Sequence, residues 1–181
     1  RAEPKLKPVL DPRIAYLMTN LMEGVINRGT GARARGMGFT PPAAGKTGTS
    51  HDGWFAGYTS GLLCIVWVGF DDNRELNLDG ATSALPIWTE FMKKATAAQP
   101  WLANAPFVPP EEGITKVTID ATTGLLAAAE CTEVIAESYV SGTDPKESCS
   151  VAAHDWLLNL RQVPTDVSQE PSIAEPGKST P

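Results

Sequence analysis

Three strand-like segments of the sequence are separated by only two short turns. Residues 46–50, 53–59 and 62–70 are rich in apolar and β-branched side chains, and the turn-forming sequences Ser-His-Asp-Gly and Ser-Gly separate them. Strands that follow one another this closely can only be joined by tight reversals, so we expect an antiparallel meander. The third segment is apolar on both faces, which predicts a central strand covered on both sides.

Two helices are expected beside the meander. Asp11-Pro12 can begin the first, because Asp accepts hydrogen bonds from unpaired amides and Pro suits the first helical position. Apolar residues then recur every three to four positions, which predicts an amphipathic helix with a wide buried stripe ending at Gly29. The glycine-rich residues 29–42 are expected to form a mobile loop. A second helix should open at Pro86, with this buried face: Ile87, Trp88, Phe91, Met92 and Ala95.

The fold class that follows is α+β, an antiparallel sheet packed by helices with a small β-hairpin extension. We expect residues 1–100 to hold the sheet and helices and residues 101–160 to form the β-rich extension. In the extension, residues 113–128 alternate like a strand and contain a turn at Thr123-Gly124, which predicts the hairpin. Residues 161–181 are rich in Pro, Ser, Thr and Glu and are expected to be disordered.

Composition and charge exclude several partners. The net charge of −6 argues against a nucleic-acid surface, because neutralising phosphates requires clustered Lys and Arg. The longest apolar run, residues 62–68, is too short for a membrane span, which needs about 20 residues. The start, Arg1 to Pro4, does not resemble a secretory signal, and we expect it to be an internal point of a longer chain.

The cysteines predict one disulfide. Cys131 and Cys149 flank a polar loop, and a bridge between them would close about 18 residues and contribute about 3 kcal/mol in an oxidising compartment. A zinc site that includes the nearby His154 is the alternative. The cysteine spacing matches no metal pattern, so we expect no metal and no cofactor. Cys64 lies in the apolar run and is expected to be a buried free thiol.

Lys46 lies in a Gly-Lys-Thr sequence, as the lysine of a phosphate-binding loop does. Here Thr40 occupies the position where that loop requires glycine, and Pro41-Pro42 have no amide hydrogens to offer a phosphate. The loop must also open a helix, and three glycines between positions 48 and 57 make a helix unfavourable. The sequence therefore predicts that Lys46 lies on a strand and does not hold a nucleotide.

On a strand, the residues that follow Lys46 could bind the end of a peptide. Thr47 and Thr49 can donate hydrogen bonds to a carboxylate beside the lysine charge, and Gly48 leaves the strand bare for an extended peptide. An ordinary solvated lysine with strand threonines is an equal alternative from these residues alone.

Neighbouring residues invite two further interpretations. Ser50-His51-Asp52 contains the residue types of a catalytic triad, but consecutive residues of a turn point to different sides, so we expect only a polar turn. Trp54, Trp67 and Trp88 are expected to be core aromatics, and stacking of Trp54 near the site is the alternative.

Several sequence motifs occur in a specific order. KTGTS at 46–50 is followed by GWFAGYT at 53–59 and VWVGFDD at 66–72, with GVINRGTG upstream at 24–31 and ALPIW downstream at 84–88. This set resembles the C-terminal half of the transpeptidase domain of class A, bifunctional penicillin-binding proteins. The resemblance covers roughly residues 8–97, and the region after residue 105 resembles the C-terminal extension of many of these proteins.

The resemblance implies a D,D-transpeptidase that cross-links peptidoglycan stem peptides through an acyl-enzyme serine and is acylated by β-lactams. By this resemblance, Lys46 would tune the proton network and attract the substrate's terminal carboxylate, which the hydroxyls of Thr47 and Thr49 would hold. The backbone N–H of Thr49 would form half of an oxyanion hole, and Gly48 would give clearance. The implied catalytic residues are Lys46 and Thr49, and the implied substrate-binding residues are Thr47, Gly48 and Thr49.

The chain departs from the family pattern in its serines. None has Lys three positions later or Asn two positions later, so the nucleophile and the middle motif are absent. We expect them in the rest of the transpeptidase domain, N-terminal to this segment, and we expect the isolated chain to be inactive. The implied parent also carries a glycosyltransferase domain and is anchored in the bacterial cytoplasmic membrane, with this segment on the periplasmic or cell-wall side. The alternatives are a non-catalytic peptidoglycan- or partner-binding module and a β-lactamase or penicillin-sensor relative.

Overall fold

The computed structural model describes residues 7–155 and divides the chain into two units. Among the described residues, the first unit contains 7–117 and 137–144, and the second contains 118–136 and 145–155. The predicted disordered tail, 161–181, lies outside the described residues.

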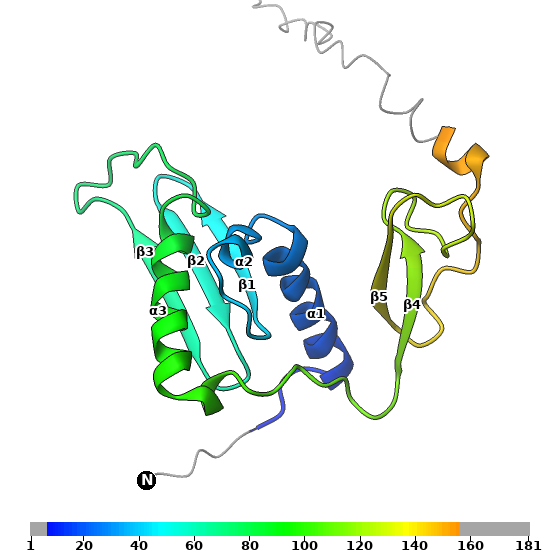
Figure 1. Ribbon diagram of the computed structural model, residues 1–181, viewed down its shortest axis with the longest axis horizontal. Coiled ribbons are helices and arrows are strands. Elements are labelled where there is room, and N and C mark those ends of the chain that lie inside the picture. Colours follow the sequence, from blue (N-terminus) through cyan, green and yellow to red (C-terminus); the bar gives the residue numbers. More distant parts are fainter. Residues whose placement is uncertain (1–6, 156–181) are drawn as a thin grey trace, which may run out of the picture. The chain divides into compact units, whose positions relative to one another are not determined.

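A three-stranded antiparallel sheet is the centre of the first unit (Figure 1). Its strands are β1 (Ala44–Thr49), β2 (Gly53–Tyr58) and β3 (Leu63–Val68), in the order β1-β2-β3. The register pairs Gly48 with Trp54 and Trp54 with Trp67. The predicted antiparallel meander is confirmed.

The prediction that the third strand is central and covered on both sides is wrong for the described part of the chain. β3 lies at one edge of the sheet, and side chains on one of its faces are exposed: Leu63, Ile65 and Trp67. The other face packs against the core through Cys64, Val66 and Val68. Within residues 7–155, helix α3 (Ala84–Ala98) packs on one face of β3, and the apolar residues of the other face are exposed.

The first helix, α1 (Pro12–Arg28), begins and ends where the sequence predicts. The Asp11 carboxylate accepts a hydrogen bond from the Arg13 amide, and the Gly29 amide donates to carbonyls of the last turn. The predicted wide buried stripe is only partly present, because only Ile26 of this helix is fully buried. Three apolar residues on one stripe are exposed: Ile14, Met18 and Leu21.

The segment expected to be a loop after Gly29 contains a short helix, α2 (Arg33–Gly36). Arg35, a residue of this helix, connects it to the segment that follows. Its guanidinium donates hydrogen bonds to the Phe39 and Pro41 carbonyls at 2.8 Å each. These bonds fix the path of the chain into β1.

Helix α3 (Ala84–Ala98) covers one face of the sheet, against β2 and β3 (Figure 1). It begins two residues before Pro86, and its buried residues are Ala84, Leu85, Trp88, Thr89 and Met92. Ile87 and Phe91, which were expected on the buried face, are half exposed. The helix is therefore rotated from the predicted orientation, so that Trp88 and Met92 meet the sheet.

Trp88 is the largest side chain of the core and is fully buried. Its ring packs edge-to-face against Phe55 and Phe39, with centroids 4.9 Å and 5.3 Å away, and its Nε1 donates to the Gly57 carbonyl at 3.2 Å. Trp54 and Trp67 are 42% and 44% exposed, so the prediction that all three tryptophans are core residues is wrong for these two.

The chain continues through a 3₁₀ turn, η1 (Pro100–Leu102), to a two-stranded ribbon of β4 (Ile114–Asp120) and β5 (Val134–Val140). The predicted turn at Thr123-Gly124 exists, with Gly124 at a φ of 72°. The segment after this turn makes only an isolated bridge to β4, from Leu126 to Ile119. The strand that pairs with β4 is β5, which lies further along the chain. The predicted hairpin over 113–128 is therefore wrong in its second strand.

Candidate functional site

Lys46 and the residues that follow it lie on β1, at the edge of the sheet opposite β3. The strand forms because β2 follows after a tight turn, in which the Ser50 amide donates to the Asp52 carbonyl at 3.2 Å. No helix follows Lys46, so the arrangement of a phosphate-binding loop is excluded here.

The side chain of Lys46 is exposed and bends along the strand. Its Nζ donates to the Thr47 carbonyl at 2.6 Å and lies 3.5 Å from the Thr47 hydroxyl. Successive side chains of a strand point to opposite faces, so this bend brings the ammonium group and a hydroxyl from the other face together. Because an ammonium group has three donors, further hydrogen bonds to an external acceptor remain available.

The two threonine hydroxyls are held by different neighbours. The Thr47 hydroxyl lies 3.0 Å from the hydroxyl of Thr30, just after α1, and the Thr49 hydroxyl oxygen accepts from the Gly80 amide at 3.2 Å. Because the Gly80 amide is the donor in its pair, the hydroxyl hydrogen of Thr49 can be donated to another group. One edge of the sheet thus presents an ammonium group and two hydroxyls, the chemistry that binds a carboxylate.

Two glycines allow close packing around this motif. A Cβ at Gly80 would lie 2.3 Å from the Trp54 carbonyl oxygen and 2.6 Å from that of Gly48, so only glycine lets this loop approach the strands. A Cβ at Gly48 would lie 3.2 Å from the Cβ of Trp54, its register partner. Trp54 therefore borders the Gly48 position, where the strand carries no side chain.

The polar turn after β1 does not form a catalytic triad. Asp52 accepts a hydrogen bond from the Trp67 indole at 2.9 Å, whereas the His51 Nδ1 lies 3.9 Å from a Glu75 carboxylate oxygen. The two side chains therefore have separate partners, as the sequence predicts.

Thr30 and Gly80 are contacts that the sequence analysis did not identify. Thr30 lies in the GVINRGTG stretch, which belongs to the ordered set of motifs and could have drawn attention to it. Its contact with Thr47 could not be predicted, because the two residues are 17 positions apart. Gly80 lies in an irregular loop, and no periodic pattern marks its approach to β1.

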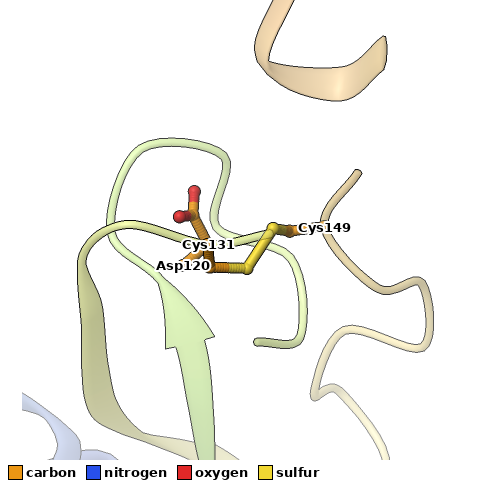
Figure 2. Close-up of side chains that lie close together, drawn as sticks. All are labelled: Asp120, Cys131 and Cys149. Atoms are coloured by element: carbon orange, nitrogen blue, oxygen red, sulfur yellow. A yellow bond between two sulfur atoms is a disulfide. The ribbon is translucent and has the colours of Figure 1, made fainter. Parts of the chain in front are cut away.

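In the second unit, the structure joins Cys131 and Cys149 by a disulfide (Figure 2). The Asp120 carboxylate lies beside them and is fully buried, and His154 lies within 3.6 Å of the Cys149 sulfur. Cys64 is a free thiol in the first unit, half-buried rather than fully buried as predicted, and burial raises its pKa.

Comparison with known proteins matches both units of the chain. Residues 110–153 match the family model described as the C-terminal domain of penicillin-binding protein 1A. Penicillin-binding protein 1A of Pseudomonas aeruginosa is 46% identical over 125 residues, and the alignment covers 66% of this chain. The chain belongs to the class A penicillin-binding protein family.

Other relatives extend the similarity over most of this penicillin-binding protein segment. Penicillin-binding protein 1A of Aquifex aeolicus is 34% identical over 152 residues, which is 81% of this chain. Penicillin-binding protein 2D of Bacillus subtilis is 33% identical over 151 residues, or 79% of the chain. The aligned segment spans 15%, 20% and 21% of the length of these three relatives. Within residues 7–155, no helix has the length and apolar character to cross a membrane.

Proposed function

We propose that this segment forms one wall of the D,D-transpeptidase site of a bifunctional peptidoglycan synthase. In this proposal, the parent protein cross-links stem peptides through an acyl-enzyme serine that this chain does not contain, and β-lactams acylate the same serine. The observation that carries the proposal is the position of the KTGT motif on an exposed edge strand, with Lys46, Thr47 and Thr49 grouped at that edge.

The chemistry of this edge suits the carboxylate end of a peptide or of a β-lactam. The ammonium group of Lys46 supplies charge, and the hydroxyls of Thr47 and Thr49 supply donors in a fixed arrangement. The backbone N–H of Thr49 is proposed as half of an oxyanion hole, with the amide of the nucleophile as the other half. Trp54 borders the bare Gly48 position, where it can stack on a bound group.

The exposed apolar surfaces of the first unit suggest that another part of the protein packs against them. We propose that this part is the rest of the transpeptidase domain. Exposed apolar stripes occur on α1 at Ile14, Met18 and Leu21, on β3 at Leu63, Ile65 and Trp67, and on α3 at Ile87 and Phe91. Grouped exposure of this kind marks surfaces that another part of a protein covers.

The disulfide supports an extracytoplasmic location. Bonds of this kind persist in oxidising compartments, and a periplasmic or cell-wall-facing position would provide one. We propose that the parent is anchored in the cytoplasmic membrane by a segment outside this chain and also carries a glycosyltransferase domain.

The test replaces Lys46 in the whole parent protein. Lys46→Ala is expected to lower the rate of acylation by a fluorescent penicillin by at least about 100-fold, since it removes the charge that attracts the ligand carboxylate. Lys116→Ala is the matched control, because Lys116 is also an exposed strand lysine but lies on β4. It should leave the acylation rate unchanged.

Equal acylation of the Lys46→Ala and Lys116→Ala proteins would refute the role of the motif. A parent protein with no serine that penicillin acylates would refute the transpeptidase proposal as a whole and favour a non-catalytic binding module.

A further inference from the structure

The Thr47 hydroxyl has a neighbour that is not part of the KTGT motif. The Thr30 hydroxyl, in the segment between α1 and α2, lies 3.0 Å from it. Thr30 is exposed, whereas Thr47 is half-buried. Because an exposed threonine can satisfy its hydroxyl with water, folding alone does not require this contact.

The segment that carries Thr30 is held tightly against the last turn of α1. The amides of Gly29 and Gly31, on either side of Thr30, both donate to the Val25 carbonyl, at 3.1 Å and 2.9 Å. A Cβ at Gly29 would lie 2.9 Å from the Val25 Cα, and a Cβ at Gly31 would lie 3.1 Å from the Val25 carbonyl oxygen. Glycine at both positions therefore allows this close approach, which fixes the backbone from which the Thr30 side chain extends.

The chemistry of the groups around Thr47 limits the direction of each hydrogen bond. A threonine hydroxyl has one hydrogen to donate and can also accept, whereas an ammonium group only donates. The Lys46 Nζ, 3.5 Å from the Thr47 hydroxyl oxygen, is therefore the donor in that pair. Without a ligand, either of the hydroxyls of Thr30 and Thr47 can donate to the other.

A bound carboxylate would remove this freedom. An ionised carboxylate only accepts, so a Thr47 hydroxyl that contacts it must donate its single hydrogen to the ligand. The bond between the two threonines is then kept only if Thr30 is the donor. Because chains of hydrogen bonds polarise one another, a hydroxyl that accepts such a bond becomes a stronger donor. Thr30 can thus orient Thr47 and strengthen its bond to a carboxylate without touching the ligand.

The other threonine of the motif is held in a similar way. The Thr49 hydroxyl oxygen accepts from the Gly80 amide at 3.2 Å. Each of the two hydroxyls at this edge therefore has a neighbour from outside β1 that is able to donate to it, which leaves its hydrogen for an external acceptor. The donor to Thr49 is a backbone amide that side-chain substitution cannot remove, whereas Thr30 offers a side chain that can be replaced.

We propose that Thr30 is a positioning residue of the carboxylate-binding edge, which acts through Thr47 and makes no contact with the ligand. This inference rests on the proposed transpeptidase function. When the carboxylate of a peptide or a β-lactam binds, the Thr30 hydroxyl donates to the Thr47 oxygen, and the Thr47 hydroxyl donates its hydrogen to the ligand. Only hydrogen bonds change at Thr30.

The experiment measures the second-order rate constant for acylation of the whole parent protein by a fluorescent penicillin. Thr30→Val removes the hydroxyl at nearly constant volume and should lower this constant about threefold to tenfold, the effect of one hydrogen bond. Thr30→Ser keeps the hydroxyl and should retain most of the rate. Thr40→Val is the matched control, because Thr40 is another exposed threonine between α1 and β1, and it should leave the rate unchanged.

A double-mutant cycle separates an effect through Thr47 from a general effect on the fold. Thr47→Val should itself slow acylation by at least about tenfold, because it removes a donor to the carboxylate. In that background, Thr30→Val should cost less than about twofold, since the residue through which it acts has lost its hydroxyl. If the Thr30→Val protein does not fold, Thr30→Ala takes its place in the same cycle.

Three results would overturn the positioning role. They are a Thr30→Val rate equal to that of Thr40→Val, equal losses in Thr30→Val and Thr30→Ser, and an equal cost of Thr30→Val with and without the Thr47 hydroxyl.

Lys46→Ala, measured in parallel, distinguishes this failure from failure of the proposed function. If Lys46→Ala slows acylation and Thr30→Val does not, the positioning role is wrong and the proposed site stands. If neither variant slows acylation, or penicillin acylates no serine of the parent, both proposals are wrong.

Discussion

Replacing Gly57 with alanine would place a methyl group directly against the indole of Trp88. An ideal Cβ at Gly57 lies 2.8 Å from Cε2 and Cζ2 of Trp88 and 2.7 Å from Cε1 of Phe55. Both rings are fully buried and pack edge-to-face, so neither can move into solvent to make room. The rings or the strand must therefore shift.

The expected cost combines three contributions. Overpacking a well-packed core typically costs about 1–3 kcal/mol. The shift also weakens the 3.2 Å hydrogen bond from the Trp88 Nε1 to the Gly57 carbonyl, a bond worth about 1 kcal/mol. The lower entropy of the unfolded alanine chain offsets about 0.4–1 kcal/mol. We expect the free energy of unfolding to fall by about 2 kcal/mol.

Urea unfolding of the 181-residue chain, followed by circular dichroism, measures this change. Gly36→Ala is the matched control, because a Cβ at Gly36 would meet no atom within 4 Å and should change the free energy of unfolding by less than about 1 kcal/mol. Trp88→Phe removes the two indole atoms that clash and leaves only the contact with Phe55, so Gly57→Ala should cost less in that background. An equal cost of Gly57→Ala in both backgrounds would refute the packing argument.

Three further predictions follow from the disulfide, Asp120 and Thr49. Reducing the Cys131–Cys149 bond in metal-free buffer should lower the free energy of unfolding by about 3 kcal/mol in urea titrations, since it closes a loop of 18 residues. Burial raises the pKa of the Asp120 carboxyl, but hydrogen bonds from Thr123 and the charge of His154 outweigh it and hold the pKa below its ordinary value. Because the folded pKa lies below the unfolded one, this stabilisation is complete above about pH 4 and is lost as the pH falls through the folded pKa. In the parent, Thr49→Val should slow penicillin acylation by at least about tenfold, measured with the fluorescent penicillin, because it removes the hydroxyl donor.

Each of these predictions has its own control. A Cys131→Ser, Cys149→Ser variant that is as stable as the oxidised chain would contradict the first. Asp120→Asn should flatten the acid side of the stability profile, and an unchanged slope would contradict the second. Thr49→Ser keeps the hydroxyl and should retain most of the acylation rate, so equal losses in both variants would contradict the third.

The features that could be predicted from the sequence depend on local chemistry. The Asp11 cap, the end of α1 at Gly29 and the meander all follow from residues within a few positions of each other. The placement of Lys46 on a strand followed from the same reasoning, because the prolines before it and the glycines after it exclude the helix of a phosphate-binding loop.

Which apolar side chains of each helix and strand are exposed to solvent could not be predicted in the same way. The sequence shows that Ile65, Trp67 and Phe91 favour burial, but it does not show whether the partner surface belongs to this chain. The predicted hairpin over 113–128 was wrong in its second strand for a related reason. The Thr123-Gly124 turn is a strong local signal, yet pairing of β4 with β5 depends on contacts between distant residues.

The candidate site was predictable only as a motif. The residues at 46–49 predicted a strand that could bind a carboxylate, with an ordinary solvated lysine as an equal alternative. The contacts that orient these residues come from Thr30 and Gly80, 17 and 31 residues away from their partners. The pair of the buried Asp120 and the partly exposed His154 is likewise separated by a long stretch of chain and became visible only in three dimensions.

The position of β3 at the edge of the sheet has a consequence for handling the isolated chain. Its six residues, Leu63–Val68, carry no charge and no proline, whereas the opposite edge strand carries Lys46, and charged edge residues oppose the pairing of one molecule with another. Asp71 and Asp72 follow just beyond β3 and act as gatekeepers at one of its ends only. Concentrated solutions of this segment should therefore self-associate through that strand, and a lysine introduced at exposed Ile65 would be the first remedy to try.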